Sequence, residues 1–137
     1  MRTQRQVVDY ALQRRALLAD LRSGKVGTDE VCDASPYLLR AARFHGEESD
    51  ELCPVCGRER LSLVSWVFGE ELKHVAGSAR KPAEIDQLAN LYGEFSVYQV
   101  EVCRTCSWNH LVLSYVTGSG APPGKPRRSD PRRNAAE

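Results

Sequence analysis

The stretch that decides the fold is CRTCSWNH, residues 103–110, taken together with CPVCG, residues 53–57. Each stretch holds two cysteines separated by two residues, a spacing whose tight turn directs both sulfurs toward one metal ion. Gly57 follows the first pair and permits the positive φ that such a turn often needs. Two turns of this kind complete the tetrahedral thiolate shell that zinc prefers. We therefore predict one structural zinc ion, held by Cys53, Cys56, Cys103 and Cys106.

The sequence around the cysteine pairs has the composition of β-strands. Residues 61–68, 94–102 and 110–117 are rich in β-branched and aromatic side chains. Each pair then adjoins a strand end, as in a zinc ribbon, where turns at the ends of antiparallel strands hold the metal. The 46 residues between the pairs exceed the usual separation of about 15–20. A helix predicted over 82–92, opened by a proline and ended by Gly93, accounts for the excess as an insertion.

The N-terminal part of the chain carries the signals of short helices. A capping-box pattern and the helical spacing of apolar residues predict a helix over residues 4–22. Thr28 begins a second, shorter helix, and the Ser-Pro pair at 35–36 opens a third, which Gly46 ends. The acidic run over 47–51 is predicted to be a solvated linker.

These segments predict an α+β fold with three regions. Residues 1–46 form an N-terminal helical segment, and residues 47–117 form a four-cysteine zinc-ribbon domain of about three antiparallel strands with one inserted helix. Residues 118–137, rich in Pro, Gly and Arg, lack apolar mass and are predicted to be a disordered basic tail. A structural zinc contributes roughly 10–16 kcal/mol to folding. We therefore expect loss of one cysteine ligand to unfold residues 52–117 and to affect the N-terminal helices less.

The net charge of +1 conceals an uneven distribution along the chain. Residues 1–46 carry eight basic and five acidic side chains, residues 47–117 carry six and eleven, and residues 118–137 carry five and two. The cysteine-bearing middle is therefore acidic, which favours a protein partner over the phosphates of nucleic acid. The candidate nucleic-acid contacts are the arginines of the basic ends: Arg2, Arg5, Arg14, Arg15, Arg127, Arg128, Arg132 and Arg133.

The motifs of common enzymes are missing from the sequence. There is no Gly-rich phosphate loop, no HExxH, no GxSxG and no His-x-Glu upstream of CPVCG of the kind that zinc deaminases use. Four cysteine ligands leave no open coordination position, so we predict a non-enzymatic protein. A thiol redox centre, the alternative, needs a Cys-x-x-Cys pair at the start of a helix. We expect Cys32 to be buried as a small apolar residue and His110 to lie on a strand near the site.

Nothing in the sequence indicates a membrane or a secreted protein. No apolar run approaches the roughly 20 residues of a membrane-spanning helix, and MRTQRQVVDY lacks the apolar core of a signal peptide. We expect a cytoplasmic protein, whose thiols stay reduced and available to a metal.

Three stretches, DASPYLLRAARFHGE, CPVCG and GEFSVYQVEVCRTCSWNHLVLSYVTG, resemble an uncharacterised family of small actinobacterial proteins, a domain-of-unknown-function group. The resemblance covers about residues 3–118 and supports the four-cysteine site. The predicted ribbon is also similar to those of transcription factors, RNA polymerase subunits and ribosomal proteins. We predict a zinc-binding adaptor that docks on a larger cytosolic assembly, an RNA polymerase or ribosome-associated one. The alternatives are nucleic-acid binding through the basic helix and tail, and a thiol redox protein or switch.

Overall fold

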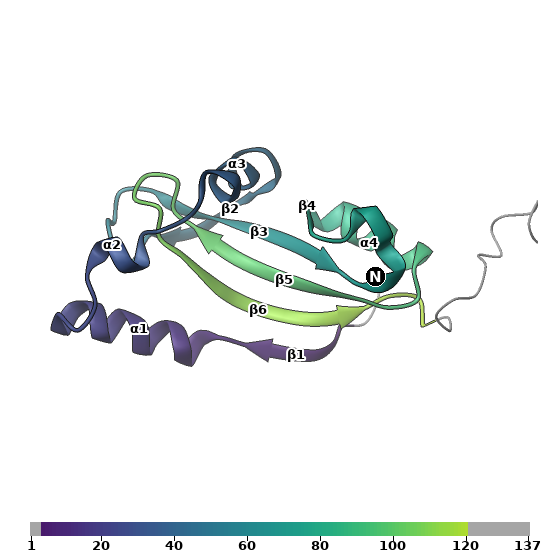
Figure 1. Cartoon of the computed structure of the whole chain (residues 1–137), viewed down its shortest axis with the longest axis horizontal. Helices are drawn as coiled ribbons and strands as arrows, with labels where there is room; N and C mark the ends of the chain where they lie inside the picture. The colour runs from purple at the N-terminus through teal and green to yellow at the C-terminus, as the bar shows by residue number, and fades with distance from the viewer. Residues whose placement is uncertain (1–3, 121–137) are drawn as a thin grey trace, which may run out of the picture.

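Three strands form where β-branched and aromatic residues are concentrated, as predicted. In the computed structural model, which describes residues 4–120, they are β3 (Arg60–Phe68), β5 (Phe95–Val102) and β6 (Asn109–Thr117). They lie side by side and antiparallel in the middle of the sheet, with β5 between the other two (Figure 1). The α+β fold class is confirmed.

The sheet is larger than the three strands that the sequence predicted. The described residues add β1 (Arg5–Asp9), β2 (Glu47–Leu52) and β4 (Ser78–Arg80), all paired antiparallel in the order β1-β6-β5-β3-β2, with β4 also on β3. The helix predicted over 4–22 is therefore wrong in its first turns, and the run over 47–51 is an edge strand rather than a linker. Backbone pairing to β6 and β3 outweighs the local preferences of these two segments.

Apart from the start of α1, the helices begin and end close to the predicted signals. α1 (Ala11–Ser23) ends at Gly24, whose φ is 85°, and α2 (Thr28–Val31) is short. α3 (Pro36–His45) begins at Ser35, whose Oγ accepts a hydrogen bond from the Leu38 backbone N–H at 3.1 Å. The inserted segment contains the 3-10 helix η1 (Glu70–Val75) and α4 (Pro82–Leu91), which confirms the predicted inserted helix.

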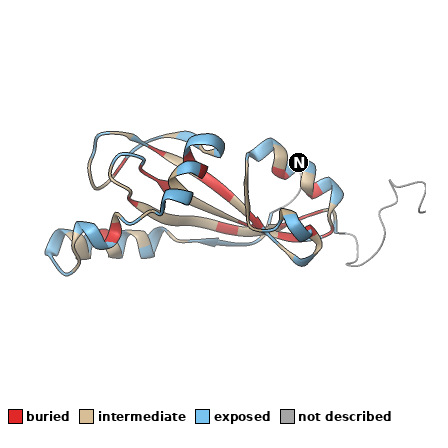
Figure 2. Cartoon of the chain, turned by 45° about the horizontal axis from the view of Figure 1, so that its top comes forward, coloured by how far each residue is buried: buried red, intermediate tan, exposed pale blue. Residues whose placement is uncertain are grey.

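The helices cover both faces of the sheet, because neighbouring residues of a strand point to opposite sides. α1 packs its buried Leu18 near Leu61 at the cysteine end of one face, and α4 packs Ile85 near Val67 farther along that face. α3 packs on the opposite face, against Val64. Figure 2 shows the buried residues gathered in the strands and the inner sides of the helices.

The single sheet takes strands from both sides of residue 46, since β1 pairs with β6. The predicted disordered tail lies outside the described residues apart from 118–120. Among residues 4–120, no helix has the length and apolar character needed to cross a membrane.

Candidate metal centre

The two cysteine pairs meet at one end of the sheet. The first pair lies in the loop between β2 and β3, and the second in the loop between β5 and β6 (Figure 1). Because β3 and β5 are adjacent and antiparallel, the end of one strand lies beside the start of the other, which brings the loops together across the 46 intervening residues. Strand pairing therefore brings together two cysteine pairs that are far apart in the sequence.

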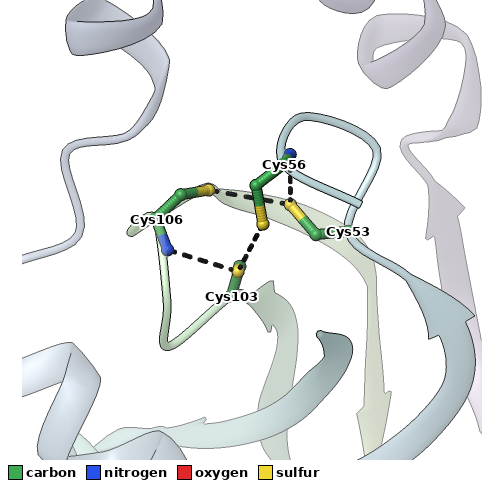
Figure 3. Close-up of side chains that lie close together, drawn as sticks. All are labelled: Cys53, Cys56, Cys103 and Cys106. Atoms are coloured by element: carbon green, nitrogen blue, oxygen red, sulfur yellow. Dashed lines mark hydrogen bonds between the residues drawn. The ribbon is translucent and has the colours of Figure 1, made fainter. Parts of the chain in front are cut away.

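The four sulfurs have the spacing of a metal shell. All four Sγ atoms lie within 4.8 Å of one another. The Sγ atoms of Cys53 and Cys106 are 3.7 Å apart, and those of Cys56 and Cys103 are 3.6 Å apart (Figure 3). Sulfurs at tetrahedral corners about 2.3 Å from a zinc ion would be about 3.8 Å apart. The four clustered cysteines could therefore hold one metal ion.

Each loop folds into the same kind of turn around its first sulfur. The backbone N–H of Cys56 points to Cys53 Sγ at 3.5 Å, and that of Cys106 points to Cys103 Sγ at 3.4 Å. The residue after each pair has a positive φ, 65° at Gly57 and 75° at Ser107. Such N–H groups stabilise a thiolate and orient it before a metal arrives.

The environment of the thiols is mostly apolar. Burial raises the pKa of the Cys53 and Cys103 thiols, and it raises that of Cys106 to about 12. Cys56 is the exception, since the backbone N–H of Arg58 lowers its pKa. A bound divalent cation would favour the thiolates and reverse the effect of burial, because metal binding displaces the thiol protons.

A fifth thiol lies at the edge of the cluster. Cys32, which follows α2, places its Sγ 3.6 Å from Cys106 Sγ and is only half-buried. The sequence predicted a buried apolar role for Cys32 and missed this position. The only sequence feature that pointed to Cys32 was that it is the fifth cysteine in a chain whose other four form two pairs. Cys32 does not belong to the group whose four sulfurs are all mutually close.

An ion pair with a buried carboxylate lies next to Trp108, which packs beside the cysteines. Glu101, only 3% exposed, accepts hydrogen bonds on Oε2 from Arg14 Nε and from Trp108 Nε1, each at 2.7 Å. Trp108 is fully buried and packs in the same core cluster as Cys53 and Cys103. The sequence did not single out Glu101, because a glutamate in a strand carries no sign of burial.

The other residues chosen from the sequence are dispersed. Arg14 pairs with Glu101 and with Glu51, so part of its donor capacity is used inside the protein. Arg5 lies half-buried on β1, and Arg15 is exposed on α1. His110 lies on β6 with its ring stacked on Trp108 at 5.9 Å, outside the four-sulfur group, as expected. The remaining candidate arginines fall outside the described residues: Arg2, Arg127, Arg128, Arg132 and Arg133.

The chain has relatives among uncharacterised proteins. Residues 1–131 match the model of a family of unknown function, DUF5318. Uncharacterised proteins of Mycobacterium bovis and Mycobacterium tuberculosis are each 59% identical to this chain over 128 residues. The aligned part is 93% of this chain and 93% of each relative. No solved structure matches the chain. The resemblance to an uncharacterised actinobacterial family is thus confirmed, and the chain belongs to the family DUF5318.

Proposed function

We propose that the chain is a non-enzymatic binding protein whose fold is held by one structural zinc ion. The observation that carries this proposal is the group of four cysteine sulfurs at tetrahedral spacing. Tetrahedral thiolate shells suit zinc, and four protein ligands leave no position for a water or a substrate. The ion therefore contributes folding free energy and no catalysis.

Metal content tests the structural zinc. Native mass spectrometry of the purified full-length chain should show one zinc per molecule. Replacement by Co²⁺ should give the absorption bands of a tetrahedral four-sulfur site, and Cys56→Ser should weaken them. Purified protein without zinc that keeps its fold and cannot take up Co²⁺ would refute the metal site.

The partner surface that we propose is the acidic edge of the sheet. β2 is an edge strand in the described structure and presents four exposed carboxylates, on Glu47, Glu48, Asp50 and Glu51. An edge strand offers unpaired backbone groups to which an extended segment can add, and the carboxylates favour a basic one. We propose that the protein is a cytoplasmic adaptor that docks here on a larger assembly, an RNA polymerase or ribosome-associated one.

Affinity purification tests the adaptor. The tagged full-length chain should retain a stoichiometric partner from extract after nuclease treatment. Glu47→Lys with Asp50→Lys should release it, while the matched pair Glu70→Lys and Glu94→Lys at the opposite end of the sheet should not. Loss of every partner on nuclease treatment would contradict docking through protein.

A thiol switch is the second candidate, and the position of Cys32 favours it. Hydrogen peroxide could accept two electrons from the Cys106 thiolate and the Cys32 thiol, which are 3.6 Å apart. One disulfide would form, and the peroxide with one added proton would become two waters while the metal loses a ligand. Zinc release by peroxide should then be slower in Cys32→Ser than in the unaltered chain. Equal release rates would rule the switch out.

A further inference from the structure

A groove of about 440 Å³ lies between α3 and β4, on the face of the sheet that α3 covers. This volume falls within the roughly 300–1,000 Å³ usual for ligand sites. Aromatic and basic side chains supply much of its lining: Tyr37, Arg40, Phe44, His45, Trp66 and Arg80. Flat apolar rings beside cations suit a ligand that combines a planar base with a phosphate.

The cations of the groove are available to a ligand. Within residues 4–120, neither Arg40 nor Arg80 takes part in an ion pair. Arg40 is exposed, while Arg80 is half-buried and positioned by a hydrogen bond from its Nε to Ser78 Oγ at 3.0 Å. Of the described lining residues one is acidic, Glu84, and its carboxylate accepts from the Lys81 backbone N–H at 2.8 Å. The groove is locally basic although residues 47–117 are acidic as a whole.

The aromatic rings continue beyond the groove across the sheet. Tyr37 and Trp66 have ring centroids 5.6 Å apart, and Trp66 on β3 lies directly opposite Tyr98 on β5. Phe68 contacts Tyr98 edge to face, with centroids also 5.6 Å apart. We call these four residues the aromatic stripe. Tyr37 is 58% exposed and Phe68 is 44% exposed, so both ends of the stripe are open to solvent.

The length of the aromatic stripe favours a strand of several nucleotides over a single free nucleotide as the ligand. A free nucleotide needs one stacking surface, whereas successive aromatics on a sheet can stack successive bases. The Phe68 end of the stripe is acidic, because Glu70, Glu71 and Glu94 line the hollow beside Phe68. Phosphates would be repelled there and attracted at the Arg40 end. Aromatic side chains on a sheet typically stack about two or three bases.

We propose that the groove and the aromatic stripe bind single-stranded nucleic acid, with bases on the stripe and phosphates beside Arg40 and Arg80. This site differs from the acidic edge of β2 and from the basic ends of the chain. The proposal does not depend on the adaptor function. It requires only that the fold is intact, which zinc content and circular dichroism report for each variant.

Fluorescence provides the test, because Trp66 lies at the site and the second tryptophan, Trp108, is fully buried. An oligouridylate of about 12 nucleotides should quench the fluorescence of the zinc-loaded full-length chain. The double variant Arg40→Gln with Arg80→Gln should bind about tenfold or more weakly and lose about 1.4 from the log–log salt slope, or about 0.7 for each phosphate contact. Tyr37→Ala should weaken binding about fivefold or more.

Matched variants separate this site from nonspecific attraction. Arg40→Gln alone should weaken binding, whereas Arg22→Gln removes the same single charge from the exposed end of α1 and should leave affinity unchanged. The full chain with its tail arginines changed to glutamine should still bind: Arg127, Arg128, Arg132 and Arg133. The proposal would be overturned if Arg22→Gln and Arg40→Gln weakened oligonucleotide binding equally. It would also be overturned if only the variant without the tail arginines lost affinity. Uridine monophosphate that binds as tightly as the oligonucleotide would overturn it too, since that outcome would assign the groove to a free nucleotide.

Discussion

At the scale of single residues, the difference between Cys32 and the four clustered cysteines is chemical and testable. Cys32 Sγ is near one sulfur of the cluster, whereas the other four sulfurs are all mutually close. We predict that Cys32→Ser keeps one zinc per chain and that Cys53→Ser does not. Zinc displaced by a chromogenic chelator measures both. Full zinc in Cys53→Ser together with loss in Cys32→Ser would mean that Cys32 is the true ligand.

The buried carboxylate of Glu101 makes the second residue-scale prediction. Removal of Arg14 would leave a buried charge without its cation, and such losses cost roughly 3–5 kcal/mol. Arg14→Met should therefore lower the free energy of unfolding by about 3 kcal/mol, measured by urea denaturation of the zinc-loaded chain. Glu101→Gln removes the charge itself and keeps an acceptor for Trp108, so it should cost about 1–2 kcal/mol.

The double variant supplies the control for that pair. With both charges removed, Arg14→Met should cost far less in the Glu101→Gln background than alone, because no buried carboxylate remains. If the two losses simply add, the contact at 2.7 Å between Arg14 Nε and Glu101 Oε2 contributes no coupling and the prediction fails.

At the scale of elements, the two cysteine turns differ at one equivalent position, which is Gly57 in the first and Ser107 in the second. Gly57 and Ser107 both have positive φ, which an L residue adopts only at a cost of about 1–2 kcal/mol. We predict that Ser107→Gly raises the free energy of unfolding by about 0.5–1 kcal/mol and that Gly57→Ala lowers it by about 1 kcal/mol. A Cβ at Gly57 would meet nothing within 4 Å, so this cost is conformational alone.

Ser107→Ala separates conformation from the loss of a hydroxyl. It keeps the Cβ and the positive φ, so its stability in the zinc-loaded state should stay close to that of the unaltered chain. A stabilisation by Ser107→Ala as large as that by Ser107→Gly would show that the hydroxyl, and not the backbone, is the source of the strain.

Elements whose signals are local were predictable, and elements formed by long-range pairing were not. The cap at Ser35 and the β-branched runs of β3, β5 and β6 were sufficient for those elements. β1 follows a helical pattern in sequence, and β2 consists largely of carboxylates that strands normally avoid. Both are edge strands, so their conformation comes from the neighbour that they pair with. The sequence of β1 or β2 itself does not indicate which strand each will pair with.

The candidate metal site was predictable for a related reason, and its surroundings were not. Cysteine spacing identifies the four clustered cysteines because the turn that each pair forms is local. Cys32 reaches the edge of the cysteine group, and Glu101 reaches Trp108, through the packing of α2 and β5, which the spacing does not encode. The groove beside α3 likewise depends on how β4 extends the sheet.

At the scale of the whole molecule, the core divides into clusters that do not follow the chain. The cluster at the metal end combines Leu18 of α1 and Val31 of α2 with Cys53, Cys103 and Trp108. The cluster at the other end joins Ile85 and Ala89 of α4 to β3 and β5. α1 and α2 therefore share their core with the cysteine loops, whereas α3 packs in a separate cluster. We now predict that α1 loses its structure together with the cysteine loops, although the sequence led us to expect that the N-terminal helices would be less affected.

Hydrogen exchange after metal removal tests this division. With a strong chelator present, the amides of α1 should lose protection together with those of the two cysteine loops, because Leu18 packs in the same cluster as the ligands. The amides of α4 should lose protection later, since α4 packs in the separate cluster. Restoring zinc should restore both, which controls for irreversible damage. If α1 stays protected while the cysteine loops exchange, the N-terminal segment folds without the metal, and the sequence-based expectation was the better one.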